Sequence, residues 1–289
     1  MLVNKNLHEL ARAEWAFQFE SLHAWLPTVV SILNREKLDF QKPDTSAFAG
    51  FLNAQAKRLD TTEVLQGNID EKVIGYVDAV GPLMKYSDWC NTGADKISSQ
   101  LAYMLEDDNV KGVILNIDGP GGAVSGIAEF NKIAKAKNKP IVALVDLCAS
   151  AHYWTACMVA DHIMASNNIS AQIGSVGVMV SFADSREMLE KQGYKFHEIY
   201  SDYSAHKNEA FKLARQGKYD LIKEEHLNPT AKKFQEAVRK ARPNLIEEKG
   251  VLTGKTFEAE KALEYGMIDS IGSLKEAIEL IDVLTELNY

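Results

Sequence analysis

Cysteine is scarce in this sequence, and the three cysteines present form no recognisable framework. Cys90, Cys148 and Cys157 include no CxxC pair, and no His and Cys residues cluster at the spacing of metal ligands. An odd number of cysteines disfavours a disulfide scaffold, so we expect a protein of a reducing compartment. We expect neither a bound metal nor an organic cofactor.

Long apolar runs and clusters of positive charge are also missing. The longest apolar stretch near the start, Ala24–Leu33, contains Pro27 and is much shorter than the roughly 20 residues that a bilayer span needs. Acidic residues precede it, where a signal peptide would have basic ones. The formal net charge of −8 includes no basic block, which disfavours a nucleic-acid-binding surface. We therefore expect a soluble, cytoplasmic protein that binds no nucleic acid and does not span a membrane.

The first 60 residues differ in pattern from the rest of the chain. Their apolar residues recur at helical spacing between Leu7 and Trp25, and Ala47–Leu59 is predicted as a further short helix. No chemically reactive groups pair in this region. We therefore expect residues 1–60 to form a helical extension, and residues 61–289 to form the domain that carries the chemistry.

From Lys72 onward, strand patterns alternate with helical patterns. Strands are expected at 73–80, 112–117, 141–145, 162–165 and 176–180, with an extended segment at 196–200. Helices are expected at 94–105, 123–137, directly after Ser150, and at 185–192, 219–248, 257–265 and 274–287. This alternation implies right-handed βαβ crossovers and a largely parallel sheet, which is an α/β fold.

Residues with catalytic potential follow two of the predicted strands. The glycine-rich run at 118–122, DGPGG, comes directly after one of them, and Gly121 and Gly122 let the backbone approach a ligand and aim an N–H group at it. Such a donor suits an oxyanion hole, although a simple tight turn has the same composition. Ser150 lies between another strand and a helix, where free amides and the helix dipole gather. This serine is either a helix N-cap or a nucleophile.

A serine nucleophile needs a base within hydrogen-bond reach. His152 lies two residues after Ser150 and so points to a different side of the helix, and the other histidines have no obvious carboxylate partner. A lysine acts as a base only when neutral, which requires a lowered pKa, and Ser–Lys dyads are a known variant of the catalytic triad. Lys207 follows the extended segment 196–200 among small and polar residues. Taken alone, a lysine in such a loop is a solvated surface charge.

Between about residues 73 and 280 the sequence contains, in order, GVILNIDGPGG, LCASAHYWTACMVADHIMAS, IGSVGVMV and LTGKTFEAEKALEYGMIDSIGSLKEAI. These four segments resemble the signal peptide peptidase A family of serine peptidases, and in particular its phage-type branch of capsid assembly (prohead) proteases. Three features depart from the family pattern. Gly119 replaces the serine of D-S-P-G-G, Ala-His follows the nucleophile in place of Gly-Gly or Ala-Ala, and the loop around Lys207 is only loosely similar.

The resemblance implies a catalytic dyad. Ser150 matches the family's nucleophile, and Lys207 matches its base lysine, 57 positions downstream. Three other lysines, Lys195, Lys212 and Lys218, remain alternative candidates for the base.

The resemblance also implies the surroundings of the dyad and the fold. Gly122, next to Gly121, matches the oxyanion glycine, and the amide of Ala151 is the second donor. Ser175 falls on a family serine that would hold the lysine amine. The fold expected for residues 61–289 is of the Clp/crotonase type, a spiral of ββα units that assembles into homo-oligomeric rings.

The leading hypothesis is a serine endopeptidase that cleaves protein substrates, specifically a phage- or prophage-encoded capsid maturation protease in the host cytoplasm. Its partners would be scaffold, capsid or portal proteins. One alternative is a cytosolic hydrolase of proteins or peptides, similar to the signal peptide peptidases. A second is a crotonase-like acyl-CoA enzyme, which shares the fold and the glycine loop but needs no nucleophilic serine. A third is a catalytically silent ring or capsid-scaffold component.

Overall fold

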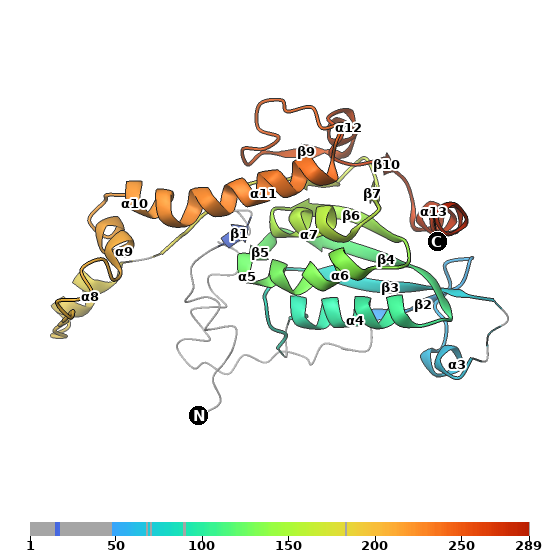
Figure 1. The fold of residues 1–289 in the computed structure, drawn as a ribbon, viewed down its shortest axis with the longest axis horizontal. Coiled ribbons are helices and arrows are strands. Elements are labelled where there is room, and N and C mark those ends of the chain that lie inside the picture. Colours follow the sequence, from blue (N-terminus) through green and yellow to red (C-terminus); the bar gives the residue numbers. More distant parts are fainter. Residues whose placement is uncertain are drawn as a thin grey trace.

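Three apolar segments form the centre of a parallel sheet: β3 (Val73–Val80), β4 (Val110–Gly119) and β6 (Ile141–Ala149). The computed structural model describes residues 15–17 and 48–288, except residues 68, 70, 89, 90 and 183. In it, helices cover both faces of the sheet, and a group of helices extends from one end (Figure 1). The predicted α/β class, with its largely parallel sheet, is confirmed.

Further strands extend the sheet on both sides. The main path runs β10 (Ser270–Ile271), β7 (His162–Ala165), β6, β4, β3 and β2 (Ala49–Leu52), and only β2 is antiparallel to its neighbour on this path. β6 pairs with β7 along its first half and with β8 (Gln172–Gly174) along its second half, and β9 (Thr256–Glu258) pairs with β8. A separate ladder joins β5 (Gly121–Ala123) to β1 (Trp15–Phe17).

Helices alternate with the strands of the sheet, and several of them follow one another in the second half of the chain. The first half of the domain contains α3 (Thr61–Leu65), α4 (Ala94–Glu106), α5 (Val124–Ile127), η1 (Ala128–Phe130), α6 (Asn131–Ala136) and α7 (Ala151–Val159). The second half contains α8 (Arg186–Lys191), α9 (Glu209–Ala214), α10 (Asp220–Ile222), the π-helical turn η2 (Lys223–Leu227), α11 (Asn228–Ala241), α12 (Ala259–Glu264) and α13 (Leu274–Asn288). In the part of the chain that the structure describes, no helix is both long and apolar enough to cross a membrane.

Alternate residues of the central strands pack into two different cores. In β4, Val113, Leu115 and Ile117 belong to the core that contains α4 and α7. The intervening Ile114 belongs to the core that contains Ile278 of α13. Side chains of a strand point alternately to opposite faces, so a strand that is apolar throughout needs cover on both faces. The helices therefore fix the sheet from two sides and hold its strand ends in place.

The structure corrects two elements that the sequence pattern predicted near the N-terminus. The stretch Ala47–Leu59, predicted as a helix, contains β2. The reason is that two adjacent residues of this strand, Phe51 and Leu52, are buried in the two opposite cores. Trp15–Phe17, predicted within a helix, forms β1. The rest of residues 1–47 lies outside the described residues, so a helical extension there stays a prediction, as does the domain boundary at residue 60.

The strand predicted at 176–180 is also wrong. The strand in this region lies earlier, as β8, and the chain leaves the ladder at its end. The physical reason is the backbone at Gly174 and Ser175, whose φ angles are 124° and 53°. Two successive residues at positive φ turn the chain away from an extended path. The segment after them is therefore a loop beside the end of β6.

We call residues 184–227 the arm; it carries α8, α9, α10 and η2 and projects away from the sheet (Figure 1). α11 leads from the arm back over α7 (Figure 1). There Phe234 of α11 stacks on Trp154 of α7, with ring centroids 4.5 Å apart and planes 6° from parallel. Both rings are buried, so this stack is a fixed joint between the arm and the core.

Candidate active site

The C-terminal ends of β4 and β6 bring the two predicted catalytic segments together. In the register of the sheet, Gly119 lies beside Cys148. The remaining residues of the DGPGG run follow Gly119, and Ser150 lies two residues after Cys148. Strands of a parallel sheet end at the same edge, and ligands of open α/β sheets bind at that edge. The glycine loop and Ser150, which the family resemblance assigns to one active site, therefore lie at the same edge of the sheet.

Ser150 stands at a strained junction between β6 and α7. Its backbone has φ 57° and ψ −116°, a region that residues with a side chain rarely adopt. It is the N-cap of α7 by position, but its side chain makes no capping hydrogen bond. Such strain persists only where surrounding contacts enforce it, and it occurs preferentially at active sites. The Ser150 side chain therefore does not act as the N-cap of α7.

Contacts with the loop after β8 hold the Ser150 backbone and hydroxyl. The Ser150 amide donates to the Gly174 carbonyl at 2.7 Å, and its Oγ donates to the Gly177 carbonyl at 3.4 Å. Ser175, at positive φ, is fixed by an amide hydrogen bond to the Lys255 carbonyl at 2.7 Å. Ser150 is almost fully buried. The predicted supporting residue Ser175 thus lies on the loop that the nucleophile candidate contacts.

The glycine loop directs one amide, that of Gly122, toward the edge on which β1 lies. On one side of β5, the Leu83 amide donates to the Gly121 carbonyl at 2.8 Å, and the Ala123 amide donates to the Leu83 carbonyl at 2.9 Å. Backbone groups of successive strand residues alternate in direction, so the amide of Gly122 points to the other side. A β-carbon at Gly122 would collide with the Leu83 backbone, which explains the glycine. The amide of Ala151 starts α7 and has no acceptor within the helix.

His152 is a functional residue that the sequence analysis did not assign. Its Nδ1 accepts the Gly121 amide at 3.1 Å, a contact buried between α7 and β5. Burial lowers the pKa of the imidazole to about 4, although a hydrogen bond with the Ala79 backbone opposes the shift. The ring is therefore neutral, with the proton on Nε2. Because its free lone pair is used by Gly121, His152 is not the base for Ser150 but positions the glycine loop.

Lys207 lies elsewhere in the chain, on the arm. It is exposed, in the turn just before α9, and α9 is far from α7 in Figure 1. The three alternative lysines are exposed as well: Lys195, Lys212 and Lys218. Within one chain, the structure brings together Ser150, Ser175, Ala151 and the glycine loop, but it does not bring Lys207 to them. The assignment of the base stays a prediction.

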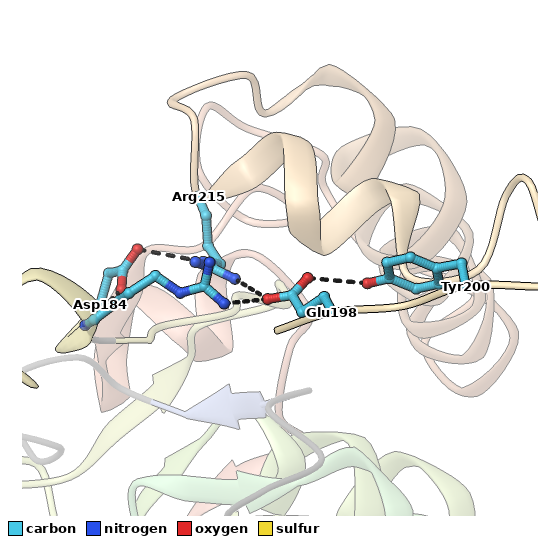
Figure 2. Close-up of polar contacts among 5 residues, drawn as sticks. Asp184, Glu198, Tyr200 and Arg215 are labelled. Carbon is cyan, nitrogen blue, oxygen red and sulfur yellow. Dashed lines mark hydrogen bonds and ion pairs between the residues drawn. The ribbon is translucent and has the colours of Figure 1, made fainter. Parts of the chain in front are cut away.

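A polar network fixes the part of the arm that carries Lys207 (Figure 2). Arg215, directly after α9, donates to Asp184 at 3.3 Å and to Glu198 at 3.2 Å, and the hydroxyl of Tyr200 donates to Glu198 at 3.1 Å. The hydrogen bonds from Tyr200 and Arg215 lower the pKa of Glu198. These contacts connect the extended segment 196–200 to the end of α9. The turn between them, which contains Lys207, is therefore held at both ends.

The C-terminal signature packs behind the nucleophile helix. The hydroxyl of Tyr153 donates to the Met267 carbonyl at 2.8 Å, and Arg242 binds Asp269 with two hydrogen bonds of 2.7 and 2.8 Å. Asp269 in turn accepts the Ile163 amide at 2.8 Å. Through these contacts, Met267 and Asp269 of the signature connect α7 and β7 to the C-terminal region. Among the described residues, no group of three or more His, Cys, Asp or Glu side chains converges as metal ligands do.

Comparison with known proteins adds relatives of stated activity. Protease 4 of Haemophilus influenzae is 27% identical over 203 residues, which is 68% of this chain and 32% of that protein. The head-tail preconnector protein GP5 of Enterobacteria phage P21 is 26% identical over 196 residues, 66% of this chain and 38% of that protein. Capsid assembly protease C of Escherichia phage lambda is 34% identical over 113 residues, 38% of this chain and 25% of that protein. The matched regions thus span about a quarter to two fifths of these relatives.

The sequence profile of peptidase family S49 matches residues 133–288, more than half of the chain. The matched range includes the Ser150 junction, the loop with Ser175, the arm and the C-terminal signature. Together with the protease relatives, this match confirms the family that the four sequence segments indicated. The chain is a member of peptidase family S49.

Proposed function

We propose that this chain is a serine endopeptidase in which Ser150 is the nucleophile and Lys207 is the base. The observation that carries the proposal is Ser150 itself: a buried serine at a strained strand–helix junction, between the N-terminus of α7 and the glycine loop. A serine hydroxyl held at a strained turn between two sets of backbone donors is suited to acyl transfer.

The reaction would follow the general course of serine peptidases. The neutral lysine takes the proton of the Ser150 hydroxyl while Oγ attacks the scissile carbonyl carbon. The oxyanion that forms accepts hydrogen bonds from the amides of Gly122 and Ala151. The lysine then gives its proton to the leaving amine, and water hydrolyses the acyl-enzyme. His152 takes no proton in this scheme, because it only holds the Gly121 amide.

The lysine of each site would come from a neighbouring copy of the chain. Lys207 lies on the arm, away from the Ser150 of its own chain, on a segment fixed by the network around Arg215 (Figures 1 and 2). Between residues 182 and 219 the chain also exposes seven large hydrophobic side chains: Phe182, Met188, Tyr194, Phe196, Ile199, Tyr203 and Tyr219. Apolar surface of this kind marks a contact with another protein. A homo-oligomer would cover it and would desolvate the lysine.

The most specific role that we propose is that of a phage- or prophage-encoded capsid maturation protease. Two relatives bear the names capsid assembly protease and head-tail preconnector protein, and both come from phages. The substrates would then be scaffold, capsid or portal proteins in the host cytoplasm. We further propose that the sheet and its crossover helices are a Clp/crotonase-type spiral, which assembles into rings. A general protein or peptide hydrolase of the signal peptide peptidase type is the second candidate, supported by the match to protease 4.

Labelling with a fluorophosphonate tests the proposal directly. The reagent should form one adduct at Ser150, identified by peptide mass spectrometry, and Ser150→Ala should abolish it. Ser170→Ala is the matched control, because this serine lies just before β8, binds Asp146 and has no proposed catalytic role, so the adduct should remain. Light scattering on the same sample gives the oligomeric state. An oligomer that is neither labelled nor able to cleave casein would favour a crotonase-like enzyme or a silent scaffold component.

A further inference from the structure

The strand β5 has one edge bound to its own domain and one edge that receives another segment. Leu83 pairs with β5 through the hydrogen bonds of Gly121 and Ala123. On the opposite edge, β5 pairs with β1, antiparallel, with Trp15 opposite Ala123, Ala16 opposite Gly122 and Phe17 opposite Gly121. The chain's own N-terminal segment is therefore seated beside the glycine that we assign to the oxyanion hole.

The register gives this contact a specific chemical meaning. The Gly122 amide points toward the edge on which β1 lies, because the neighbouring residues use the other edge. Ala16 is the residue directly opposite Gly122. An extended peptide in this position would bring the carbonyl of the residue opposite Gly122 to the amide that is to bind the oxyanion. Binding by addition of a strand to a free edge is a common mode of peptide recognition.

From this register we infer that Trp15–Phe17 occupies, within its own chain, the strand position on which a substrate peptide binds, and that it competes with substrate there. The inference rests on the proposed function, since it takes the Gly122 edge to be the substrate edge. It adds a regulatory contact and a binding mode: substrate enters as an extended, antiparallel strand and must first displace β1.

Covalent attachment makes this competition effective even if the pairing is weak. A segment that is covalently attached to its own site acts at a raised effective concentration, which depends on the length and stiffness of the connecting chain. Three residues of backbone pairing bind weakly by themselves, so a substrate that fills more of the edge can displace them. The expected result is a raised KM for small peptide substrates and little change in kcat.

A proline at position 16 tests the pairing without touching the catalytic groups. Ala16→Pro removes the amide hydrogen of the residue opposite Gly122, and proline is not tolerated inside a strand ladder. Ala16→Ser is the matched control, because it keeps the amide and nearly the same size. Both variants are made in the full chain, once with Ser150 intact and once with Ser150→Ala.

Hydrogen exchange in the Ser150→Ala background reads the pairing independently of catalysis. Gly121 and Ala123 keep their partners His152 and Leu83, so Gly122 is the amide of β5 whose protection depends on β1. Ala16→Pro should speed exchange of the Gly122 amide at least tenfold, and Ala16→Ser should leave it slow. Equal exchange in the two variants would overturn the inference.

Kinetic measurements with Ser150 intact then test whether β1 competes with a peptide substrate. For a short peptide substrate, Ala16→Pro should lower KM several-fold with kcat unchanged, and a synthetic peptide of residues 10–22 should inhibit this variant competitively. Faster Gly122 exchange with an unchanged KM would show that β1 pairs with an edge that substrate does not use, which also overturns the inference. Loss of turnover in every variant, together with no fluorophosphonate adduct, would count against the proposed function, while the exchange result still decides whether β1 pairs there.

Discussion

The imidazole of His152 occupies the space that a β-carbon at Gly119 would need. An added β-carbon there would lie 2.6 Å from Cε1 and 2.9 Å from Nε2 of His152, and it would also collide with the carbonyl of Gly81. These residues are two of the departures from the family pattern, glycine in place of serine and histidine after the Ser-Ala pair. The imidazole is one of two groups that exclude a side chain at position 119, and the Gly81 carbonyl lies closer to the added β-carbon, at 2.3 Å.

Gly119→Ala should destabilise the protein by about 1–3 kcal/mol, because the site has no room for even one methyl group. A double-mutant cycle with His152→Ala, followed by urea unfolding, measures how much of this cost the imidazole causes. We expect a coupling energy of about 1 kcal/mol or more between the two sites, with the remainder due to Gly81. Additive effects would show that the imidazole moves aside freely.

Stability should depend on pH through His152. Its pKa is about 4 in the folded protein and about 6.5 in an unfolded chain, so the unfolded state binds more protons between these values. The free energy of unfolding should therefore fall by about 3 kcal/mol as the pH drops from about 6.5 to 4.

The matched control for this titration is His152→Asn. Its side-chain oxygen can still accept the Gly121 amide, but the side chain does not titrate in this range. Wild type and variant are compared by urea unfolding at pH 7, 5.5 and 4. The difference between them should shrink steadily toward low pH, whereas a constant difference would mean that His152 is not buried in its neutral form.

Replacements of Ser150 should separate strain from chemistry. Ser150→Ala and Ser150→Gly should both abolish peptide cleavage, because each removes the hydroxyl. Glycine also adopts φ 57° without steric cost, whereas alanine does not. The glycine variant should therefore be more stable than the alanine variant by about 1 kcal/mol, or about 2–4 °C in Tm for a domain of this size. Calorimetry of the two variants measures this difference, and equal Tm values would argue against stored strain.

Mixing experiments should reveal whether the lysine comes from another copy. Ser150→Ala and Lys207→Ala should each be inactive alone. After joint refolding, about a quarter of the sites in a randomly mixed closed ring would combine an intact serine with a neighbour's intact lysine. Activity should then recover to about that fraction of wild type. Lys207→Arg should not replace the wild-type lysine, because a guanidinium stays protonated. No recovery would mean that serine and base belong to the same chain or that the base lies elsewhere.

The central sheet could be predicted from the sequence because its physical signals are local. Val73–Val80 and His162–Ala165 are short apolar runs bounded by turn residues, and the structure has strands at these bounds. Ser150 stood out for a similar reason, because the change from a strand pattern to a helix pattern occurs at that residue.

Other features depend on tertiary contacts that no local pattern contains. Ala49–Leu52 becomes a strand only because an edge of β3 is available to it. In the sequence, His152 lies two residues after Ser150, a helical spacing that indicates no contact with the serine. Only the structure shows that its Nδ1 accepts the amide of Gly121. The sequence spacing of Lys207 likewise does not show that its segment lies on the arm, far from α7 (Figure 1).

The stacked pair of Trp154 and Phe234 has a mechanical consequence. Trp154 is in α7, the helix that follows Ser150, and Phe234 is in α11, the helix that leads to the arm. A flat, buried stack resists rotation. The contact between α7 and α11 therefore sets the direction in which the arm leaves the core. In a closed assembly, that direction fixes the angular step from one copy to the next. In the proposed ring, this aromatic contact four residues from Ser150 would therefore help to set the curvature.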